Sequence, residues 1–281
     1  MKGRILFWLI TIMMPVAAHG QPTPSPYFST SQLADATNYL PPPPDTTSVQ
    51  FAYDMNRYFW GKSMRATERG EQAIYDSQGV YTIMCEIFSE AFGISISYDG
   101  TPDIYKVIAN SLKTTSNACS KCKTYYYRER PCQRFNEEEL ITGETLGHTS
   151  YPSTHAAKGW MMALLLGEIN PKTQEALFTR GYEYGESRVI VGAHWQSDVD
   201  AGRLVGSVTY ARLHSDSTFT ADLDAAKAEY KRIVGNDAVQ DIGADSFGKP
   251  SQWYTIDGKK ADDNTRGIVV GRGRKVLRTG Y

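Results

Sequence analysis

Residues 80–93 read Val-Tyr-Thr-Ile-Met-Cys-Glu-Ile-Phe-Ser-Glu-Ala-Phe-Gly, and the spacing of their apolar side chains indicates the fold class. Those side chains recur three and four residues apart, as on one face of an α-helix. The members of that face are Val80, Ile83, Met84, Ile87, Phe88 and Ala91. Gly93 stands where the face stops, a common position for glycine. The stretch therefore predicts a helix with one buried face.

Helix signals continue on both sides of this stretch. Thr101-Pro102 is typical of an N-cap followed by proline at the first helical position, and Asn170-Pro171 repeats that signal. Further helices are predicted over 155–168, 194–214 and 220–234, the last ended by Gly235. No run of alternating strand character appears between residues 46 and 234. We therefore predict an all-α body.

The composition limits the classes of protein that the chain can belong to. It has 281 residues, of which 41% are hydrophobic and 22% charged, and a formal net charge of −1. The length suits one large domain or two small ones, and the apolar fraction is enough for a core, which excludes a disordered or fibrous protein. Nucleic-acid-binding domains normally carry a basic excess, so we expect no nucleic acid as a partner.

The first twenty residues have the build of a secretory signal peptide. Lys2 and Arg4 precede a nearly apolar run from Ile5 to Val16, and small residues follow up to Gly20. We expect cleavage near Gly20 and export to the periplasm, the cell surface or the medium. A retained membrane anchor is the alternative, but the run is shorter than the roughly 20 residues that span a bilayer. No later run is longer, so no membrane span is expected in the mature chain.

The remaining chain divides into three segments by composition. Residues 21–45 are rich in proline and end in Leu40-Pro-Pro-Pro-Pro44, which predicts an extended segment on or before the domain. Residues 46–234 form the predicted all-α domain, and residues 235–281 a linker and tail. Within the tail, 253–256 and 267–270 have the character of short strands, so we predict a β-hairpin-like appendage.

The chain has four cysteines, Cys85, Cys119, Cys122 and Cys132. In an exported protein the usual state of cysteines is the disulfide, and four cysteines allow three pairings, which stay open here. A zinc site built on Cys119, Cys122 and Cys132 is the alternative. Only one C-x-x-C pair is present, so disulfides are favoured over zinc.

Three polar clusters interrupt the apolar helices and carry the candidate chemistry. They are Lys123-Thr-Tyr-Tyr-Tyr-Arg-Glu-Arg130-Pro131, Tyr151-Pro-Ser-Thr-His155 and Ser187-Arg188-Val-Ile-Val-Gly-Ala-His194-Trp-Gln-Ser-Asp198. In the third, His194 and Asp198 are four residues apart and would share one helix face, where a carboxylate can orient an imidazole. Arg188 offers a planar fork for phosphate oxygens. The alternative is an incidental His–Asp pair on a surface helix.

The other two clusters fit an anion as well. Ser153, Thr154 and His155 begin the helix predicted over 155–168, where free backbone N–H groups and the helix dipole favour negative charge. Ordinary capping is the alternative, but a histidine is unusual in a first turn. The first cluster supplies Lys123 and Arg130, with Arg128 between them. The alternative to an anion site is that these cations lie on a solvent-exposed basic surface.

Taken in order, the motifs K-x6-R-P, P-S-T-H and S-R-x5-H-x3-D resemble the signature of the class A bacterial non-specific acid phosphatases. These enzymes share a superfamily with phosphatidate phosphatases of the PAP2 type and with vanadium haloperoxidases. The resemblance covers roughly residues 40–234 and implies the helical bundle of that superfamily. The chain departs from the pattern at Thr154, where the family has glycine. If that glycine needs a positive φ, threonine strains the loop; if only the N–H matters, threonine is tolerated, which we favour.

The resemblance also implies roles for individual residues. His194 would be the nucleophile that forms a phosphohistidine, Asp198 would orient it, and His155 would be the general acid. The phosphate-binding residues would be Lys123, Arg130, Ser153, Thr154 and Arg188. The reaction would need no metal or other cofactor. Phosphate monoesters and inorganic phosphate would be its ligands and vanadate an inhibitor, and the chain would form a homo-oligomer, with a dimer favoured.

Further expectations concern protonation and alternatives. The cations should lower the pKa of His155 in the empty site, and Asp198 should raise that of His194. His148, in a loop before the second cluster, is a candidate for the rim of the site. A vanadate-dependent haloperoxidase and a non-catalytic phosphate-binding protein are the alternative functions.

Overall fold

The computed structural model describes residues 23–137, 147, 149–246, 253–255, 260–261, 267–271 and 274–278, with side chains as far as residue 235. The predicted signal peptide and His148 lie outside the described residues. The domain is built from helices, which confirms the predicted all-α class. Their bounds are α1 Val49–Met64, α2 Glu68–Asp76, α3 Tyr81–Phe92, α4 Pro102–Tyr125, α5 Pro131–Arg134, α6 Thr154–Ile169, α7 Gln174–Ile190, α8 Gln196–Leu213 and α9 Ser217–Ser246.

The helix ends follow signals in the local sequence. α3 ends at Gly93, whose φ of 92° lies in the left-handed region that favours glycine. α4 begins with Pro102 at its first position. Ser153 caps α6, because its Oγ accepts a hydrogen bond from the backbone N–H of Ala156 at 3.2 Å. Local sequence therefore accounts for where these helices start and stop.

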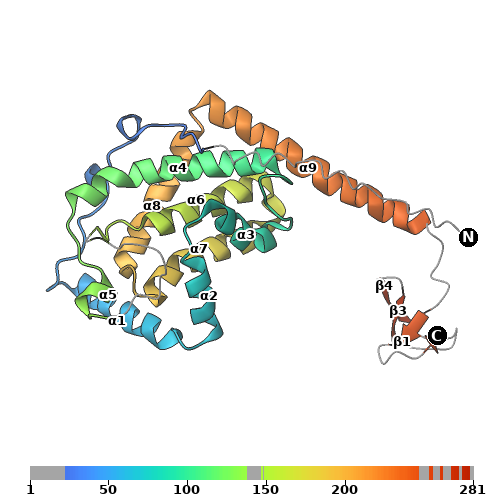
Figure 1. Ribbon diagram of the computed structural model, residues 1–281, viewed down its shortest axis with the longest axis horizontal. Coiled ribbons are helices and arrows are strands. Elements are labelled where there is room, and N and C mark those ends of the chain that lie inside the picture. Colours follow the sequence, from blue (N-terminus) through green and yellow to red (C-terminus); the bar gives the residue numbers. More distant parts are fainter. Residues whose placement is uncertain are drawn as a thin grey trace, which may run out of the picture. The chain divides into compact units, whose positions relative to one another are not determined.

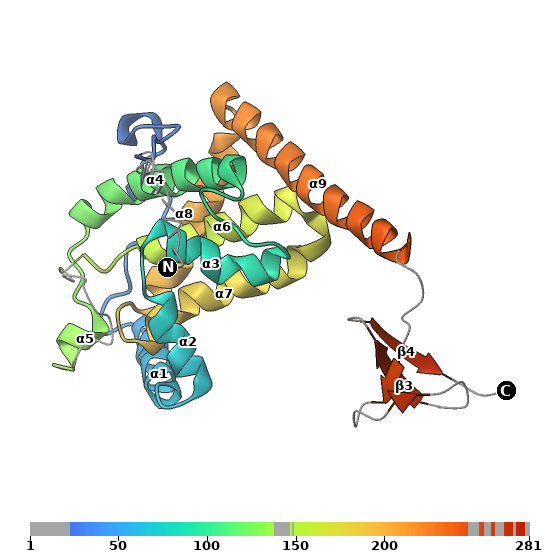
Figure 2. The same ribbon diagram turned by 45° about the vertical axis from the view of Figure 1, so that its right-hand side comes forward.

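α6 forms the centre of the domain. Figures 1 and 2 show α4 along one side of it and α7 along another, and it packs most extensively against α7 and α8. Its apolar side chains are buried nearly all round; Met161, Met162, Leu165 and Leu166 are at most 1% exposed. A helix that is apolar on every side is stable only inside a bundle, which is where α6 lies.

Two glycines let α8 approach the backbone of α6. A Cβ atom at Gly202 would lie 2.3 Å from the carbonyl oxygen of Ser153, and one at Gly206 would lie 2.7 Å from that of Ala157. Both distances are too short for any side chain. The backbone N–H of Ser153 also donates to the carbonyl of Asp198 at 2.9 Å. The starts of the two helices are thereby held together, which joins the second and third polar clusters.

The first polar cluster is attached to the other two by backbone hydrogen bonds. The N–H of Ser150 donates to the carbonyl of Arg128 at 3.2 Å, and the N–H of Cys132 donates to the carbonyl of Gly192 at 3.0 Å. The stretch from Arg128 to Cys132 therefore lies beside both other clusters, although 60 residues separate Cys132 from Gly192.

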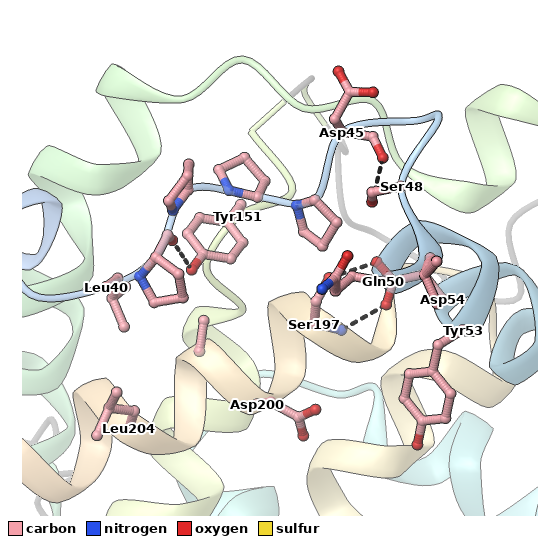
Figure 3. A pocket seen from close by; sticks show the side chains of 16 residues that line it. Leu40, Asp45, Ser48, Gln50, Tyr53, Asp54, Tyr151, Ser197, Asp200 and Leu204 are labelled. Atoms are coloured by element: carbon pink, nitrogen blue, oxygen red, sulfur yellow. Dashed lines mark hydrogen bonds between the residues drawn. The ribbon is translucent and has the colours of Figure 1, made fainter.

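The proline-rich segment lies on the domain, as the sequence indicates. It is not extended throughout, because Thr30–Gln32 and Ala36–Asn38 form short 3₁₀ helices. Residues 41–45 have no regular secondary structure, and the hydroxyl of Tyr151 donates to the carbonyl of Pro41 at 2.6 Å. Figure 3 shows this segment along the edge of a hollow of about 770 Å³ whose lining includes Tyr53 and Leu204. This hollow shares none of its lining residues with the polar cavity described below.

The C-terminal region differs from the sequence prediction in two respects. The last helix does not end at Gly235 but continues to Ser246; one interior glycine costs a helix only about 1 kcal/mol. The tail holds four antiparallel strands rather than two, in the order β2-β1-β3-β4. They are β1 Trp253–Thr255, β2 Lys260–Ala261, β3 Gly267–Gly271 and β4 Arg274–Arg278. The chain divides into two compact units, residues 1–226 and 227–281.

The expected disulfides are not present in the structure: all four cysteines are free and buried. Cys119 and Cys122 lie one turn apart on α4, while Cys85 and Cys132 lie on α3 and α5. Burial raises the pKa of Cys85 to about 12 and that of Cys122 to about 11, so both thiols stay protonated and behave as small apolar groups. In the part of the chain that the structure covers, no three His, Cys, Asp or Glu side chains are placed to hold a metal ion.

Along the described chain, none of the helices combines the length and the apolar character that crossing a membrane requires.

Candidate active site

The three polar clusters meet at a cavity of about 240 Å³. Its lining residues are Gly79, Met84, Lys123, Arg130, Thr154, His155, Lys158, Arg188 and His194. Six of the eight residues predicted for the site are in this lining; Ser153 and Asp198 are not. The cavity is slightly smaller than the roughly 300–1,000 Å³ typical of ligand pockets, which suits a small ligand.

Three of the predicted cations reach the cavity from different elements. Lys123 comes from the last turn of α4, Arg130 from the N-cap of α5 and Arg188 from the last turn of α7. The two arginines are only 6% and 1% exposed. Arg130 is held in place by hydrogen bonds from Nε to the carbonyl of Gly147 at 3.0 Å and from Nη1 to that of Ala193 at 2.8 Å. Such fixed guanidinium groups are well suited to binding phosphate oxygens.

Lys123 has an altered protonation equilibrium. Burial, followed by repulsion from Arg130, lowers the pKa of Lys123 to about 8. Its Nζ donates to the carbonyl of Thr149 at 2.7 Å. The side chain is therefore cationic in acid and at neutral pH, and loses its charge in mildly alkaline solution.

The tautomer of His194 follows from its partners. Its Nε2 lies 3.0 Å from Nη1 of Arg130. Because a guanidinium can only donate, Nε2 must accept, and it carries the lone pair. The ring proton is then on Nδ1, which lies 3.4 Å from Oδ2 of Asp198 and 3.4 Å from the hydroxyl oxygen of Ser150. The lone pair of a buried imidazole therefore lies beside the cations of the cavity.

The structure corrects two expectations for the His194–Asp198 pair. His194 is not on the helix: α8 begins at Gln196, and Asp198 lies in its first turn. The pKa of His194 is not raised but held well below 6.5, by burial and by the charges of Arg130, Lys123 and Arg188. Burial, followed by the three cations, outweighs the effect of one carboxylate.

Asp198 is also engaged by donors other than His194. Its Oδ2 accepts from the hydroxyl of Ser150 at 2.5 Å and from the backbone N–H of Trp195 at 2.8 Å. Its Oδ1 accepts from Nη1 of Arg128 at 2.5 Å. The carboxylate therefore has its oxygens fixed on the Nδ1 side of His194.

Arg128 and Asp54 extend this arrangement away from the cavity. Nη2 of Arg128 donates to Oδ2 of Asp54 at 2.7 Å, and Asp54 accepts from the N–H and the hydroxyl of Ser197 at 2.8 and 2.6 Å. Asp54 is fully buried and Arg128 is 7% exposed. The result is a buried chain of three charges, Asp54–Arg128–Asp198. Sequence reasoning missed Asp54, because nothing in α1 connects it to residues more than 140 positions later.

His155 is held by one ring nitrogen. Its Nε2 lies 2.7 Å from the carbonyl oxygen of Asp76. A carbonyl can only accept, so Nε2 carries the proton, and Nδ1 is the nitrogen available for proton transfer. The ring stacks on Tyr184 with centroids 4.3 Å apart. Burial and the charge of Arg188 hold the pKa of His155 well below 6.5, in the direction expected for the empty site.

Ser153 and Thr154 differ in their placement. Ser153 is fully buried and caps α6, as described above. Thr154 is the first residue of α6 and lines the cavity. Among the residues with a described backbone, Asn136 is the one non-glycine with positive φ. Threonine is therefore accommodated without backbone strain.

Comparisons with known proteins agree with this geometry. A family model described as the PAP2 superfamily matches residues 105–218, which contain all three clusters. The chain is 40% identical over 216 residues to the non-specific acid phosphatase of Providencia stuartii, covering 74% of this chain and 85% of the relative. It is 36% identical over 235 residues to that of Salmonella typhimurium, covering 82% and 93%. An acid phosphatase of Zymomonas mobilis is 30% identical over 224 residues, covering 77% and 83%. The chain therefore belongs to the class A bacterial non-specific acid phosphatases of the PAP2 superfamily.

Proposed function

We propose that the protein is an exported acid phosphatase that hydrolyses phosphate monoesters through a phosphohistidine and without a metal ion. The observation that carries the proposal is the lone pair on Nε2 of His194, directed toward the cations of a cavity that also contains His155. A non-catalytic phosphate-binding protein would need the cations but neither histidine.

In the proposed first step, Nε2 of His194 attacks phosphorus, and the ester P–O bond breaks as the P–N bond forms. The leaving oxygen takes a proton from Nδ1 of His155. His194 becomes cationic, and the fixed carboxylate of Asp198 stabilises that charge. In the second step water attacks phosphorus, Nδ1 of His155 takes a proton from the water, and the P–N bond breaks to release inorganic phosphate.

The charge that moves onto the phosphoryl oxygens needs fixed donors. Lys123, Arg130 and Arg188 would supply them, together with the backbone N–H of Thr154 at the positive end of α6. The hydroxyl of Ser153 accepts from Ala156 and keeps its own hydrogen for donation, but Ser153 does not line the cavity, so its contact with phosphate stays a prediction. These positive groups perform the part that a metal ion performs in other phosphatases.

The test is hydrolysis of p-nitrophenyl phosphate in excess EDTA by wild type and by His194→Ala. We expect wild type to keep its rate and to be inhibited competitively by vanadate, whose geometry resembles the transition state. His194→Ala should lose at least about a thousandfold in kcat while keeping its circular dichroism spectrum. Retention of a tenth of the wild-type kcat, or activity that EDTA removes and zinc or magnesium restores, would contradict the mechanism.

The same preparation separates the alternatives. A haloperoxidase would oxidise bromide with peroxide once loaded with vanadate, and a binding protein would take up phosphate without turnover. We also propose that the chain is cleaved near Gly20 during export and forms a dimer. N-terminal sequencing of the exported protein and analytical ultracentrifugation test these two points.

A further inference from the structure

Lys158 is a fourth cation of the cavity and belongs to none of the sequence motifs. It lies in α6 three residues after His155, so both side chains are on the same helix face, and both line the cavity. Its Nζ lies 5.2 Å from the centre of the Tyr81 ring, at the start of α3. This distance is within the range of a cation–π contact, which holds the ammonium group against that ring.

The charge balance of the cavity leaves room for a second anion. The described lining contains four Lys or Arg side chains and no carboxylate. Behind it, the Asp54–Arg128–Asp198 chain contributes one net negative charge. Counted over these described residues, a phosphate dianion leaves a net positive charge. Positive groups gathered in one cavity, two of them buried arginines, favour ligands that bring a further negative charge.

The position of Lys158 indicates where that charge would lie. The proposed acid, His155, must face the oxygen of the leaving group. Lys158 is three residues further along the same helix, a rise of about 4.5 Å. It therefore lies on the leaving-group side of the cavity, at a distance that fits a carboxylate or second phosphate a few bonds beyond the ester oxygen. Lys123, Arg130 and Arg188 remain for the phosphoryl group that is transferred.

We propose that Lys158, held against Tyr81, forms a leaving-group subsite that selects phosphate monoesters carrying a second anionic group. The inference rests on the proposed function, because the leaving-group side is defined by the role given to His155. The charge of Lys158 also acts on His155 itself, where it helps to lower the pKa of the ring. The two side chains are thus close enough for one substrate to contact both.

The experiment compares 3-phosphoglycerate with glycerol 3-phosphate, two small esters in which a carboxylate stands against a hydroxymethyl group. The measured quantity is the ratio of their kcat/KM values. We expect wild type to favour 3-phosphoglycerate, and Lys158→Met to reduce the ratio about tenfold, the effect of losing one charge-assisted hydrogen bond. Because each variant is its own reference, differences in leaving-group reactivity cancel.

Two control variants separate contact from general electrostatics. Lys158→Arg keeps the positive charge and should keep the preference. Lys113→Met removes a lysine from the exposed surface of α4 and should leave the ratio at the wild-type value. An equal loss for both esters in Lys158→Met, or the same shift in Lys113→Met, would overturn the subsite.

Binding distinguishes this inference from the proposed function. In His194→Ala, which should not turn over, isothermal titration gives the affinity for both esters with and without Lys158→Met. A preference for 3-phosphoglycerate that depends on Lys158 supports the subsite even if wild type hydrolyses neither ester, a result that would refute the phosphatase. If the enzyme hydrolyses both esters, but neither the ratio of their kcat/KM values nor the ratio of their affinities changes in Lys158→Met, the subsite is refuted and the phosphatase function stands.

Discussion

At the residue scale, the proposed nucleophile is held by buried charges that begin on another helix. Asp54 binds Arg128, Arg128 binds Asp198, and Asp198 lies beside Nδ1 of His194. Removing one member of a buried ion pair leaves an uncompensated charge, so the three charges depend on one another. Asp54 and Arg128 are absent from the cavity lining, which makes them positioning residues.

Asp54→Asn tests this dependence. In this variant Arg128 still binds Asp198 through Nη1, but Nη2 loses its charged partner. Asp198 and His194 are then held less firmly, so we expect kcat to fall about tenfold with KM nearly unchanged. The free energy of unfolding should fall by about 3 kcal/mol, the usual cost of breaking a buried pair. Steady-state kinetics and urea unfolding measure the two effects. Asp99→Asn, on the exposed surface, is the matched control. A rise in KM without a fall in kcat would show that Asp54 does not act through His194.

The protonation equilibria of the site predict an optimum on the acid side of neutrality. His194 has a lowered pKa, so its lone pair remains available well below pH 6.5. His155 must be protonated to act as the acid. Its pKa is low in the empty site and rises when a phosphate dianion binds, so kcat should fall on the alkaline side. The fall should be much weaker for p-nitrophenyl phosphate than for an alkyl phosphate. A flat alkaline limb for the alkyl ester would exclude His155 as the acid.

Lys123 should produce a separate change on the alkaline side, in the pH dependence of KM rather than of kcat. Its pKa of about 8 means that one phosphate-binding charge disappears above that pH, so KM should rise there. Lys123→Arg provides the control, because a guanidinium remains charged throughout. In that variant KM should stay level between pH 7 and about 9. If KM still rises with pH, a group other than Lys123 causes the rise.

At the scale of elements, the site depends on how closely α6 and α8 approach. His155 starts from α6 and Asp198 from α8, and Gly202 lies against the carbonyl of Ser153 between them. A methyl group at Gly202 must push the two helix starts apart, because the nearest atom is backbone and cannot rotate away.

We expect Gly202→Ala to lower the free energy of unfolding by about 2–3 kcal/mol and to reduce kcat at least about tenfold. Gly235→Ala is the matched control, since a Cβ atom there meets nothing within 4 Å. That change should be neutral or slightly stabilising in a helix. Equal stability of both variants would show that α8 can shift without disturbing the site.

At the scale of the whole molecule, concentrating cations in one cavity opposes folding. The pKa of Lys123 is lower in the folded state than its ordinary 10.5. This shift favours the unfolded state increasingly as pH falls from about 10.5 to about 8, and the full cost persists below pH 8. A bound anion offsets this cost by neutralising the cavity.

Phosphate should therefore raise the melting temperature, and more so at pH 6 than at pH 9. At a hundred times its Kd a ligand adds about 2.7 kcal/mol, or roughly 5 °C or more for a protein of this size. Differential scanning calorimetry in chloride of equal ionic strength supplies the reference. An equal shift at both pH values would mean that Lys123 does not contribute to phosphate binding.

Much of the domain could be predicted from the sequence because the signals are local. Helix periodicity predicted residues 155–168 and 194–214, which the structure places at α6 Thr154–Ile169 and α8 Gln196–Leu213. Proline at the start of α4 and glycine after α3 are signals of the same kind. The ordered motifs predicted six of the nine residues that line the cavity, since each cluster is continuous in the chain. The sheet of the tail was predicted incompletely, because strand pairing joins residues that are apart in sequence.

The tertiary structure alone decided how the predicted side chains are held. The partner of His155 is a backbone carbonyl, that of Asp76, and any residue type can offer a carbonyl. Asp54 lies far from the motifs, and the contact of Lys158 with Tyr81 forms only because α3 packs beside α6. The pKa of His194 is lowered first by burial and then by three cations from three elements. Such features arise where distant segments pack together, and the pattern of neighbouring residues does not encode them individually.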